Sequence, residues 1–391
     1  MAVKTSTPIA PSAAAARVGS SAIRDILAVT ERPEVISLAG GLPIESAFPT
    51  AELAEAADRV LAEHGGAALQ YSTTAGHAGL RTWVADRLGA DADQVVVTHG
   101  SQQALELVIR AVADPGATVA LADPAYVGAL QALRLSGVAL AGIPSDGDGM
   151  CVDVLADRLA AGLRPALVYV VANFDNPTGS TLSLERRQVL ADLADRYGFL
   201  IVEDDPYGEL RWAGARLPGL ATMTDRVVTL GTTSKILCPG LRVGWATGPA
   251  ELARSLVLLK QATDLHTASL NQLLVHDLVT RPGFLDERLP RLRSRYEQHA
   301  TAVAGALHAE LGDRLTFRVP EGGMFLWADA PGIDADALLS VAIDQGVAFV
   351  PGRAFSVDDQ PLEALRLSFA TADPAGLQEA VRRLAAAIRS V

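Results

Sequence analysis

The chain has 391 residues, with 33 Lys and Arg against 45 Asp and Glu, so its formal net charge is −12 at pH 7. A compact domain usually takes about 100–200 residues, so this length predicts two units in one chain. The acidic balance disfavours nucleic acid and anionic membranes as partners. No apolar run reaches the roughly 20 residues of a spanning helix. Two cysteines far apart in sequence predict a reduced, cytoplasmic protein.

The first two-thirds of the chain predict an α/β unit. Residues 1–16 contain a run of Ala together with Pro8, Pro11 and two serines, which offer nothing to pack, and we expect a mobile tail there. Thr50 is expected to cap a helix that Gly65-Gly66 ends. Short β-branched runs then alternate with helical patterns, which is typical of a mostly parallel sheet with helices on both faces. The expected strands are 94–98, 118–121, 166–171, 199–202, 227–230 and 244–247, with helices opening at Ser101 and covering 183–197.

The last third predicts a smaller α+β unit. A long charged helix is expected at 285–308, followed by strands at 315–319 and 324–328, then helix, strand and a final helix. The early segment 34–48, with its Gly-Gly-Leu-Pro turn, lies outside the alternating pattern and is expected to join this unit. We therefore predict an arm and part of the small domain at 17–48, a large domain at 49–284 and a small C-terminal domain at 285–391.

The most informative stretch runs from Gly231 to Trp245, behind a predicted strand. It places Lys235 among hydroxyl residues, with Arg242 seven positions later. A lysine that forms a Schiff base must lose its proton, and partial burial and a nearby cation favour that loss. Hydroxyls and an arginine fork suit a phosphate monoester. Ser-Lys alone also occurs in ordinary surface loops, so the prediction depends on the whole run.

This run resembles the lysine segment of the class I/II aminotransferases of fold type I, which use pyridoxal 5'-phosphate (PLP). From about Arg17 the chain is most similar to the 2-aminoadipate and kynurenine aminotransferase subgroup. The resemblance implies a PLP-transferase α/β fold with a smaller α+β domain. It also implies that Lys235 holds PLP as a Schiff base. An L-amino acid would pass its amino group to a 2-oxo acid, with 2-oxoglutarate as the expected acceptor, through an aldimine on Lys235 and pyridoxamine phosphate.

A second matching segment, Val-Glu-Asp-Asp-Pro-Tyr, ends a predicted strand, where α/β enzymes place residues that contact ligands. The resemblance assigns Asp204 to the pyridine nitrogen and Tyr207 to the phenolic oxygen of the cofactor. A carboxylate at the nitrogen favours the protonated ring, which is the better electron sink. Glu203 and Asp205 are the competitors for the role of Asp204.

Two turns complete the predicted cofactor contacts. Asn176, in an Asn-Pro-Thr-Gly turn, matches the family's donor to the ring oxygen and also faces the substrate, whereas no role is assigned to Asp175. Ser101 and Gln102 open a helix directly after a strand and a glycine, and free backbone N–H groups at such a helix start favour an anion. The resemblance makes them a phosphate cradle, although a plain helix cap is the alternative. His99 is expected to be structural.

Further cofactor contacts rest on the resemblance. Thr232, Ser234 and Arg242 would hold the phosphate. Tyr126 would stack on the ring, unless it is a core residue of its loop. Tyr71 matches the tyrosine that reaches the phosphate of the neighbouring subunit, which implies a homodimer.

The expected substrate contacts come from three segments. Arg366 matches the arginine that clamps the α-carboxylate, and a surface arginine on a strand is the alternative. Gly40 and Gly41 would line the substrate side. Arg24 could meet an acidic or aromatic side chain, or could simply be exposed on a helix. No metal ion is expected.

Two rival functions stay open at this point. A PLP-dependent lyase, decarboxylase or oxidase would use the same cofactor residues, because a fold does not fix a reaction. A transcription regulator that borrows this fold would carry a DNA-binding domain in front, and the net charge of −12 disfavours that reading. A dinucleotide-binding fold is excluded because no Gly-x-Gly-x-x-Gly follows a first strand.

Overall fold

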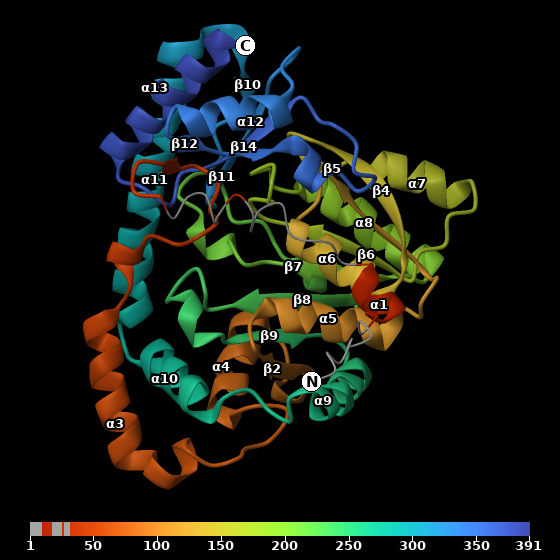
Figure 1. The fold of residues 1–391 in the computed structure, drawn as a ribbon. Helices are drawn as coiled ribbons and strands as arrows, with labels where there is room; N and C mark the ends of the chain where they lie inside the picture. Colours follow the sequence, from red (N-terminus) through yellow and green to blue (C-terminus); the bar gives the residue numbers. More distant parts are fainter. Residues whose placement is uncertain (1–9, 18–25, 27–31) are drawn as a thin grey trace, which may run out of the picture.

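An eight-stranded sheet forms the centre of the larger part of the molecule (Figure 1). The computed structural model describes residues 10–17, 26 and 32–391. Four of the seven strand pairings are parallel, and β9 runs against both of its neighbours. In spatial order the strands are β2 (Val95–Thr98), β9 (Gly244–Thr247), β8 (Val227–Thr232), β7 (Leu200–Asp204), β6 (Leu167–Val171), β3 (Thr118–Asp123), β4 (Ala139–Asp146) and β5 (Gly149–Met150).

Helices cover both faces of this sheet. Side chains of a strand point alternately to opposite faces, so Leu167 and Tyr169 join one buried cluster whereas Val168 and Val170 join another. The first cluster includes the helices α5 (Ser101–Val112), α6 (Val127–Ser136) and α9 (Ala250–Thr263). The second includes α7 (Val152–Ala160) and α8 (Leu184–Tyr197). The helices α3 (Thr50–Ala68), α4 (Ala78–Leu88) and α10 (Ser269–Thr280) pack around a third.

The long helix α11 (Phe284–Leu311) runs from the large sheet to a smaller unit (Figure 1). That unit contains an antiparallel sheet of β10 (Thr316–Phe317), β11 (Phe325–Asp329), β14 (Ala364–Ser368) and β13 (Val350–Pro351). It also contains α12 (Ala335–Asp344) and α13 (Pro374–Ser390). The early strand β1 (Ile36–Ser37) pairs in parallel with β12 (Val347–Ala348). The predicted domain boundaries remain a proposal.

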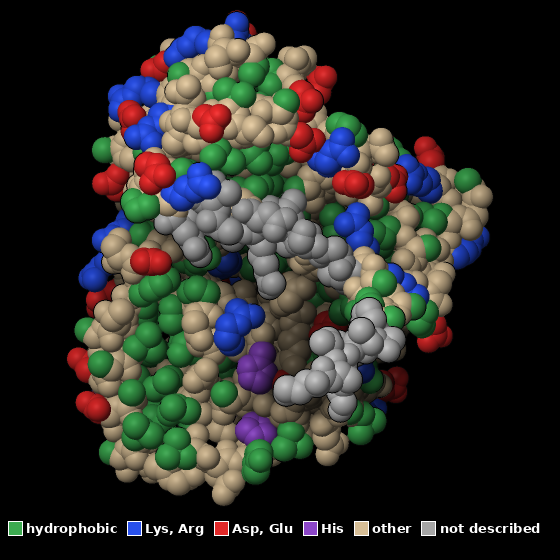
Figure 2. All heavy atoms as spheres, in the orientation of Figure 1, with side chains coloured by type: hydrophobic (Ala, Val, Ile, Leu, Met, Phe, Trp, Pro, Cys, Tyr) green, Lys and Arg blue, Asp and Glu red, His purple; other side chains and the backbone are tan. Residues whose placement is uncertain are grey.

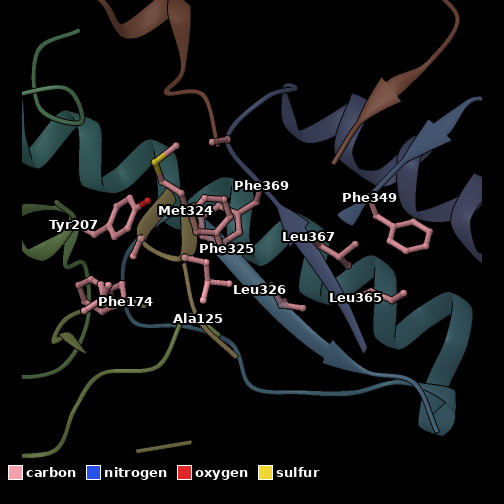
Figure 3. Packing of buried hydrophobic residues seen from close by; sticks show 14 of the residues in the cluster. Ala125, Phe174, Tyr207, Met324, Phe325, Leu326, Phe349, Leu365, Leu367 and Phe369 are labelled. Carbon is pink, nitrogen blue, oxygen red and sulfur yellow. The ribbon is translucent and has the colours of Figure 1, made fainter. Parts of the chain in front are cut away.

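Aromatic side chains join the two units (Figure 3). Tyr207 and Phe174, from the large unit, share a buried cluster with Met324 and Phe325 at the start of β11. The rings of Tyr207 and Phe325 meet edge to face, with centroids 5.9 Å apart. The carboxyl end of β7, where Tyr207 lies, therefore sits directly beside the small sheet.

Two local predictions need comment. Helix α3 begins at Thr50 after Pro49 and continues past Gly65 and Gly66 to Ala68, so the predicted glycine stop is wrong. Neither glycine adopts a positive φ, and a Cβ on either would meet no atom within 4 Å. Nothing forces a turn there, so the helical hydrogen bonds simply continue. Ala13–Ala16 form a short helix, α1, inside the segment expected to be a tail; the mobility of that segment stays a prediction.

Among the described residues, no helix combines the length and the apolarity that crossing a bilayer requires.

Arg187 in α8 is fully buried and ties the segment behind β6 to the loop beyond β7. Its guanidinium donates to three backbone carbonyl oxygens and to the side chain of Asn173, at 2.8–3.0 Å. The carboxyl group of Glu203 lies 3.7 Å away and is also buried, and burial raises its pKa to about 7. Arg187 therefore satisfies several buried acceptors and favours the ionised form of Glu203.

Replacing Arg187 with Met should destabilise the protein by about 3 kcal/mol, because four acceptors lose their buried donor and Glu203 loses its counter-charge. The neighbouring arginine provides a matched control, since Arg186 pairs with Asp146 at the surface. Arg186→Met should cost less than about 1 kcal/mol. Chemical denaturation of the two apoproteins compares them, and equal losses would contradict the assigned role of Arg187.

Candidate active site

A cavity of about 140 Å³ lies at the carboxyl ends of β6, β7 and β8, beside the start of α5. Strands that run parallel end at the same edge of a sheet, so residues far apart in sequence meet there. All ten residues predicted to contact the cofactor within one chain line this cavity. They are Ser101, Gln102, Tyr126, Asn176, Asp204, Tyr207, Thr232, Ser234, Lys235 and Arg242.

Lys235 follows β8 and turns its amine into the cavity. Its Nζ donates to the carbonyl oxygen of Gly41 at 3.2 Å and lies 5.9 Å from the centre of the Tyr207 ring. Burial, and then the positive charges of Arg242 and Arg366, lower the pKa of Lys235 to about 8. An ordinary lysine titrates near 10.4. A far larger fraction of the Lys235 amine is therefore neutral, and nucleophilic, near neutral pH.

Asp204 is the last residue of β7 and is almost fully buried. Its Oδ2 accepts a hydrogen bond of 2.8 Å from the hydroxyl of Tyr169, whereas Oδ1 has no partner among the described residues. Burial raises the pKa of Asp204 to about 7. A buried acceptor without a donor is costly, so this oxygen fits a ligand that brings an N–H group, such as a protonated pyridine ring.

The two competing carboxylates turn away from this cavity. Neighbouring residues of a strand point to opposite faces, and both oxygens of Glu203 accept from the backbone N–H of Leu220, at 3.2 and 3.1 Å. Asp205 accepts from the N–H of Gly208 at 2.8 Å. Neither lines the cavity.

Hydroxyl groups and an arginine gather at one end of the cavity. The hydroxyls of Thr232 and Ser234 lie 2.8 Å apart, and Arg242 donates to the carbonyl oxygen of His99 at 3.2 Å. The close approach depends on glycine: Gly100 has a φ of 77°, and a Cβ on Gly244 would lie 2.6 Å from the backbone of Gly100. These contacts bring β9 against the start of α5, where free N–H groups attract anions.

Tyr126 and Gln102 form the neighbouring wall. The Tyr126 hydroxyl lies 3.5 Å from the side-chain oxygen of Gln102, whose amide nitrogen donates to the carbonyl oxygen of Gly128 at 2.8 Å. A Cβ on Gly128 would come within 2.5 Å of the Tyr126 ring. The glycine therefore makes room for the tyrosine at the cavity.

Arg366 on β14 is 1% exposed. It donates to the side-chain oxygen of Asn176 at 3.0 Å and to the carbonyl oxygen of Ala39. Its guanidinium lies 4.5 Å from the ring centre of Phe325 and 4.9 Å from that of Phe355. Its Nε has no partner among the described residues, and burial lowers the pKa of Arg366 to about 10. A buried cation with free donor capacity suits a carboxylate.

Four of the remaining predicted residues do not line this cavity: Arg366, Gly40, Gly41 and Tyr71. Gly41 touches Lys235 through its carbonyl oxygen, and Gly40 lines an adjacent pocket of about 470 Å³. The side chain of Tyr71 is 78% exposed and packs edge to face on His266, with ring centroids 5.7 Å apart. It does not line the cavity of its own chain. Arg24 lies outside the described residues.

A family model described as "Aminotransferase class I and II" matches residues 33–384. The chain belongs to the class I and II aminotransferases. The chain is 43% identical over 383 residues to a 2-aminoadipate transaminase of Thermus thermophilus, covering 96% of each chain. It is 38% identical to aromatic-amino-acid aminotransferase 1 of Thermococcus litoralis, covering 95% of this chain and 92% of the relative.

Solved structures agree with this family. An alpha-aminoadipate aminotransferase from Thermus thermophilus, complexed with N-(5'-phosphopyridoxyl)-L-leucine, matches with a TM-score of 0.90 and 42% identity over 96% of both chains. The predicted fold type I architecture is confirmed, and the protein is a PLP-dependent aminotransferase. The unpaired Asp204 oxygen and the neutralisable Lys235 fit that cofactor.

The sequence motifs did not point to Tyr169, whose hydroxyl donates to Asp204 at the cavity wall. The strand Leu-Val-Tyr-Val-Val is otherwise apolar, and a buried tyrosine hydroxyl needs a hydrogen-bond partner. This single hydroxyl in the middle of an otherwise apolar strand is the sequence feature that could have predicted a buried hydrogen bond at Tyr169. Its bond to Oδ2 leaves Asp204 only Oδ1 to offer to the cavity.

Tyr169→Phe should weaken PLP binding by about tenfold, the usual effect of losing a residue that orients a ligand contact. Without this donor, the pKa of Asp204 rises further and its carboxylate can rotate. A PLP analogue with carbon in place of the ring nitrogen provides the control, because its binding should not change. Absorbance titration of both apoproteins measures the affinities, and equal losses for PLP and the analogue would argue against the assignment.

Proposed function

We propose that Lys235 binds PLP covalently and moves the substrate proton in this transamination. One observation carries the proposal: a single cavity brings together an amine with a lowered pKa, a buried carboxylate oxygen without a partner, and a group of phosphate-binding side chains. No other described cavity combines these three features.

Each wall of the cavity would bind a different part of the cofactor. Asp204 Oδ1 accepts from the ring nitrogen, Tyr126 stacks on the ring plane, and Tyr207 and Asn176 donate to the ring oxygen. Burial raises the pKa of the Tyr207 hydroxyl well above its usual value, so this hydroxyl keeps its proton and can donate it. The phosphate is held by Ser101, Gln102, Thr232, Ser234 and Arg242.

When bound, PLP supplies an electron sink for the bond that breaks at the substrate Cα. Arg366 donates to the substrate carboxylate through guanidinium N–H groups, such as Nε–H, that make no hydrogen bond within the described residues. This contact orients the substrate Cα. When free of the cofactor, Lys235 Nζ would accept the Cα proton as a general base and would then donate it, as a general acid, to the former aldehyde carbon of the cofactor. Gly40 and Gly41 are proposed to line the substrate side. A Cβ on Gly41 would lie 2.9 Å from the ring of Phe325, which packs on the Arg366 guanidinium, so glycine there leaves this arginine undisturbed.

The proposed donor is an L-amino acid and the proposed acceptor is 2-oxoglutarate. Arg366 would bind the α-carboxylate of each in turn, because donor and acceptor share that group. The relatives are named for 2-aminoadipate and for aromatic amino acids, and these side chains are the first donors to compare. A role for Arg24 at the donor side chain remains part of the proposal.

We further propose a cytoplasmic homodimer in which Tyr71 reaches the phosphate of the neighbouring subunit. Hydrophobic side chains gather over α3 and α10 on the face in Figure 2. Leu61, Leu69 and Tyr71, in and beyond α3, are large and exposed, a feature typical of interaction sites. The two cysteines are unpaired thiols, as a reducing compartment requires. Light scattering that returned the mass of one chain would contradict the dimer.

Incubation with an amino donor alone should convert the bound cofactor to pyridoxamine phosphate in one turnover. Addition of 2-oxoglutarate should then restore PLP and release glutamate. Chromatography of the extracted cofactor measures both steps for acidic, aromatic, branched and kynurenine-type donors. Consumption of amino acid without pyridoxamine phosphate would instead indicate a lyase, decarboxylase or oxidase.

The rate at which apoenzyme captures PLP should rise with pH through a midpoint near 8, because only the neutral amine attacks the aldehyde and the pKa of Lys235 is about 8. Below that pH the amine is protonated and capture slows. Stopped-flow absorbance follows the reaction. Lys235→Ala should show no capture, and borohydride reduction should attach no cofactor to the peptide that carries position 235. A midpoint near 10, the range of a free lysine, would contradict this environment.

A further inference from the structure

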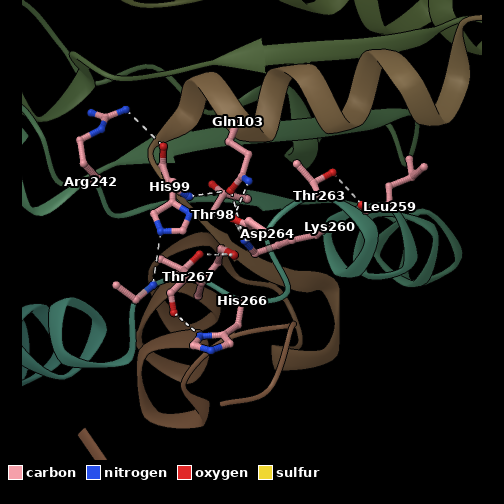
Figure 4. A network of polar contacts seen from close by, with 12 residues as sticks. Thr98, His99, Gln103, Arg242, Leu259, Lys260, Thr263, Asp264, His266 and Thr267 are labelled. Carbon is pink, nitrogen blue, oxygen red and sulfur yellow. Dashed lines mark hydrogen bonds and ion pairs between the residues drawn. The ribbon is translucent and has the colours of Figure 1, made fainter. Parts of the chain in front are cut away.

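A polar network of Lys260, Asp264, Gln103 and His99 lies behind the phosphate end of the cavity, and the proposed reaction uses none of these four side chains (Figure 4). At its centre is Lys260 of α9, which is fully buried. Its Nζ donates to both oxygens of Asp264, at 2.8 and 2.7 Å, and to the side-chain oxygen of Gln103 at 3.2 Å. Asp264 also accepts from Gln103 at 2.7 Å.

The network holds His99 by its ring and by its backbone. His99 Nε2 accepts from the N–H of Ala268 at 3.4 Å, so the proton of the neutral ring is on Nδ1, which donates to Asp264 at 2.7 Å. The backbone N–H of His99 donates to the side-chain oxygen of Gln103 at 2.8 Å. Both ends of the residue are therefore fixed relative to Lys260 and Asp264.

His99 passes this constraint to the phosphate cradle. Its carbonyl oxygen accepts from Arg242, and the next two residues are Gly100 and Ser101 at the start of α5. A Cβ on Gly100 would lie 2.7 Å from the Arg242 guanidinium, so the arginine lies directly against this backbone. A shift of His99 would therefore alter both its hydrogen bond to Arg242 and the start of α5.

Burying the ammonium group of Lys260 does little to stabilise a core, because its desolvation offsets much of its attraction to the partly exposed Asp264. A hydrogen-bonded network of this kind does provide a single defined arrangement. The hydrogen bonds of the network lead to His99, and His99 contacts Arg242 and precedes the start of α5. The defined arrangement therefore acts on the phosphate end of the cavity.

We propose that Lys260 and Asp264, through Gln103 and His99, are positioning residues that preform the binding site for the cofactor phosphate. The inference rests on the proposed function, which places the phosphate at Ser101 and Arg242. It adds that a lysine and an aspartate outside the cavity set the affinity for the phosphate group, and for no other part of the cofactor.

Titration of apoenzyme with PLP and with pyridoxal, which lacks the phosphate, tests this. Lys260→Met and Gln103→Met should each weaken PLP binding by about tenfold, as expected when a supporting contact is lost, while pyridoxal binding changes by less than about twofold on the same scale. Gln103→Met breaks the network without unpairing a charge, so it tests the proposal even if Lys260→Met does not fold. Arg110→Gln, on the exposed side of the same α5–α9 contact, is the matched control and should leave both affinities unchanged.

Arg242→Met separates this inference from the proposed function. If Arg242→Met loses the preference for PLP over pyridoxal but both network variants keep it, the positioning role is wrong and the phosphate site stands. If Arg242→Met keeps the preference, the phosphate has been placed wrongly and the proposed function fails at that point. Equal losses of PLP and pyridoxal affinity in the network variants would show only general damage, and would overturn the positioning role.

Discussion

Desolvation of charged groups is the constraint on which this active site depends. Asp204 and Arg366 are buried and Lys235 is partly buried, and burial is the main cause of the pKa shift of each. Removal from water makes the lysine easier to deprotonate and the carboxylate more basic. Two polar atoms of this site, Asp204 Oδ1 and Arg366 Nε, have no hydrogen-bond partner among the described residues. A ligand with complementary groups would supply those hydrogen bonds.

The fold holds this arrangement with contacts that do no chemistry. Tyr169 fixes one oxygen of Asp204, Asn176 touches Arg366, and His99 links Arg242 to the network around Lys260. Each of these contacts crosses between strands, or between the large and small units. Because the supports are buried and satisfied, the cavity can keep its shape before the cofactor binds.

Glycine decides where backbones approach each other. At Gly244 and Gly100, strand β9 meets the start of α5. The absence of a side chain at Gly128 leaves room for the Tyr126 ring. A side chain at Gly244 would push against the backbone at the start of α5, whereas one at Gly100 or Gly128 would displace the side chain of Arg242 or Tyr126. The two glycines inside α3, by contrast, face open space and leave the helix unbroken, so a glycine in the sequence has no fixed structural meaning.

The sequence by itself determined six of the eight strands of the large sheet, because short apolar runs are local in sequence, but it missed β4 and β5. Through the order of its motifs and the family resemblance, it also identified the residues that line the cavity. It could not decide between Asp204 and its two acidic neighbours by chemistry alone; the pleat of β7 does that, by turning only Asp204 to the cavity. Tyr169, the Phe325–Arg366–Phe355 stack and the Lys260 network emerged only in the tertiary structure. Their partners lie far away in sequence, and no local pattern specifies a contact that forms when distant elements pack.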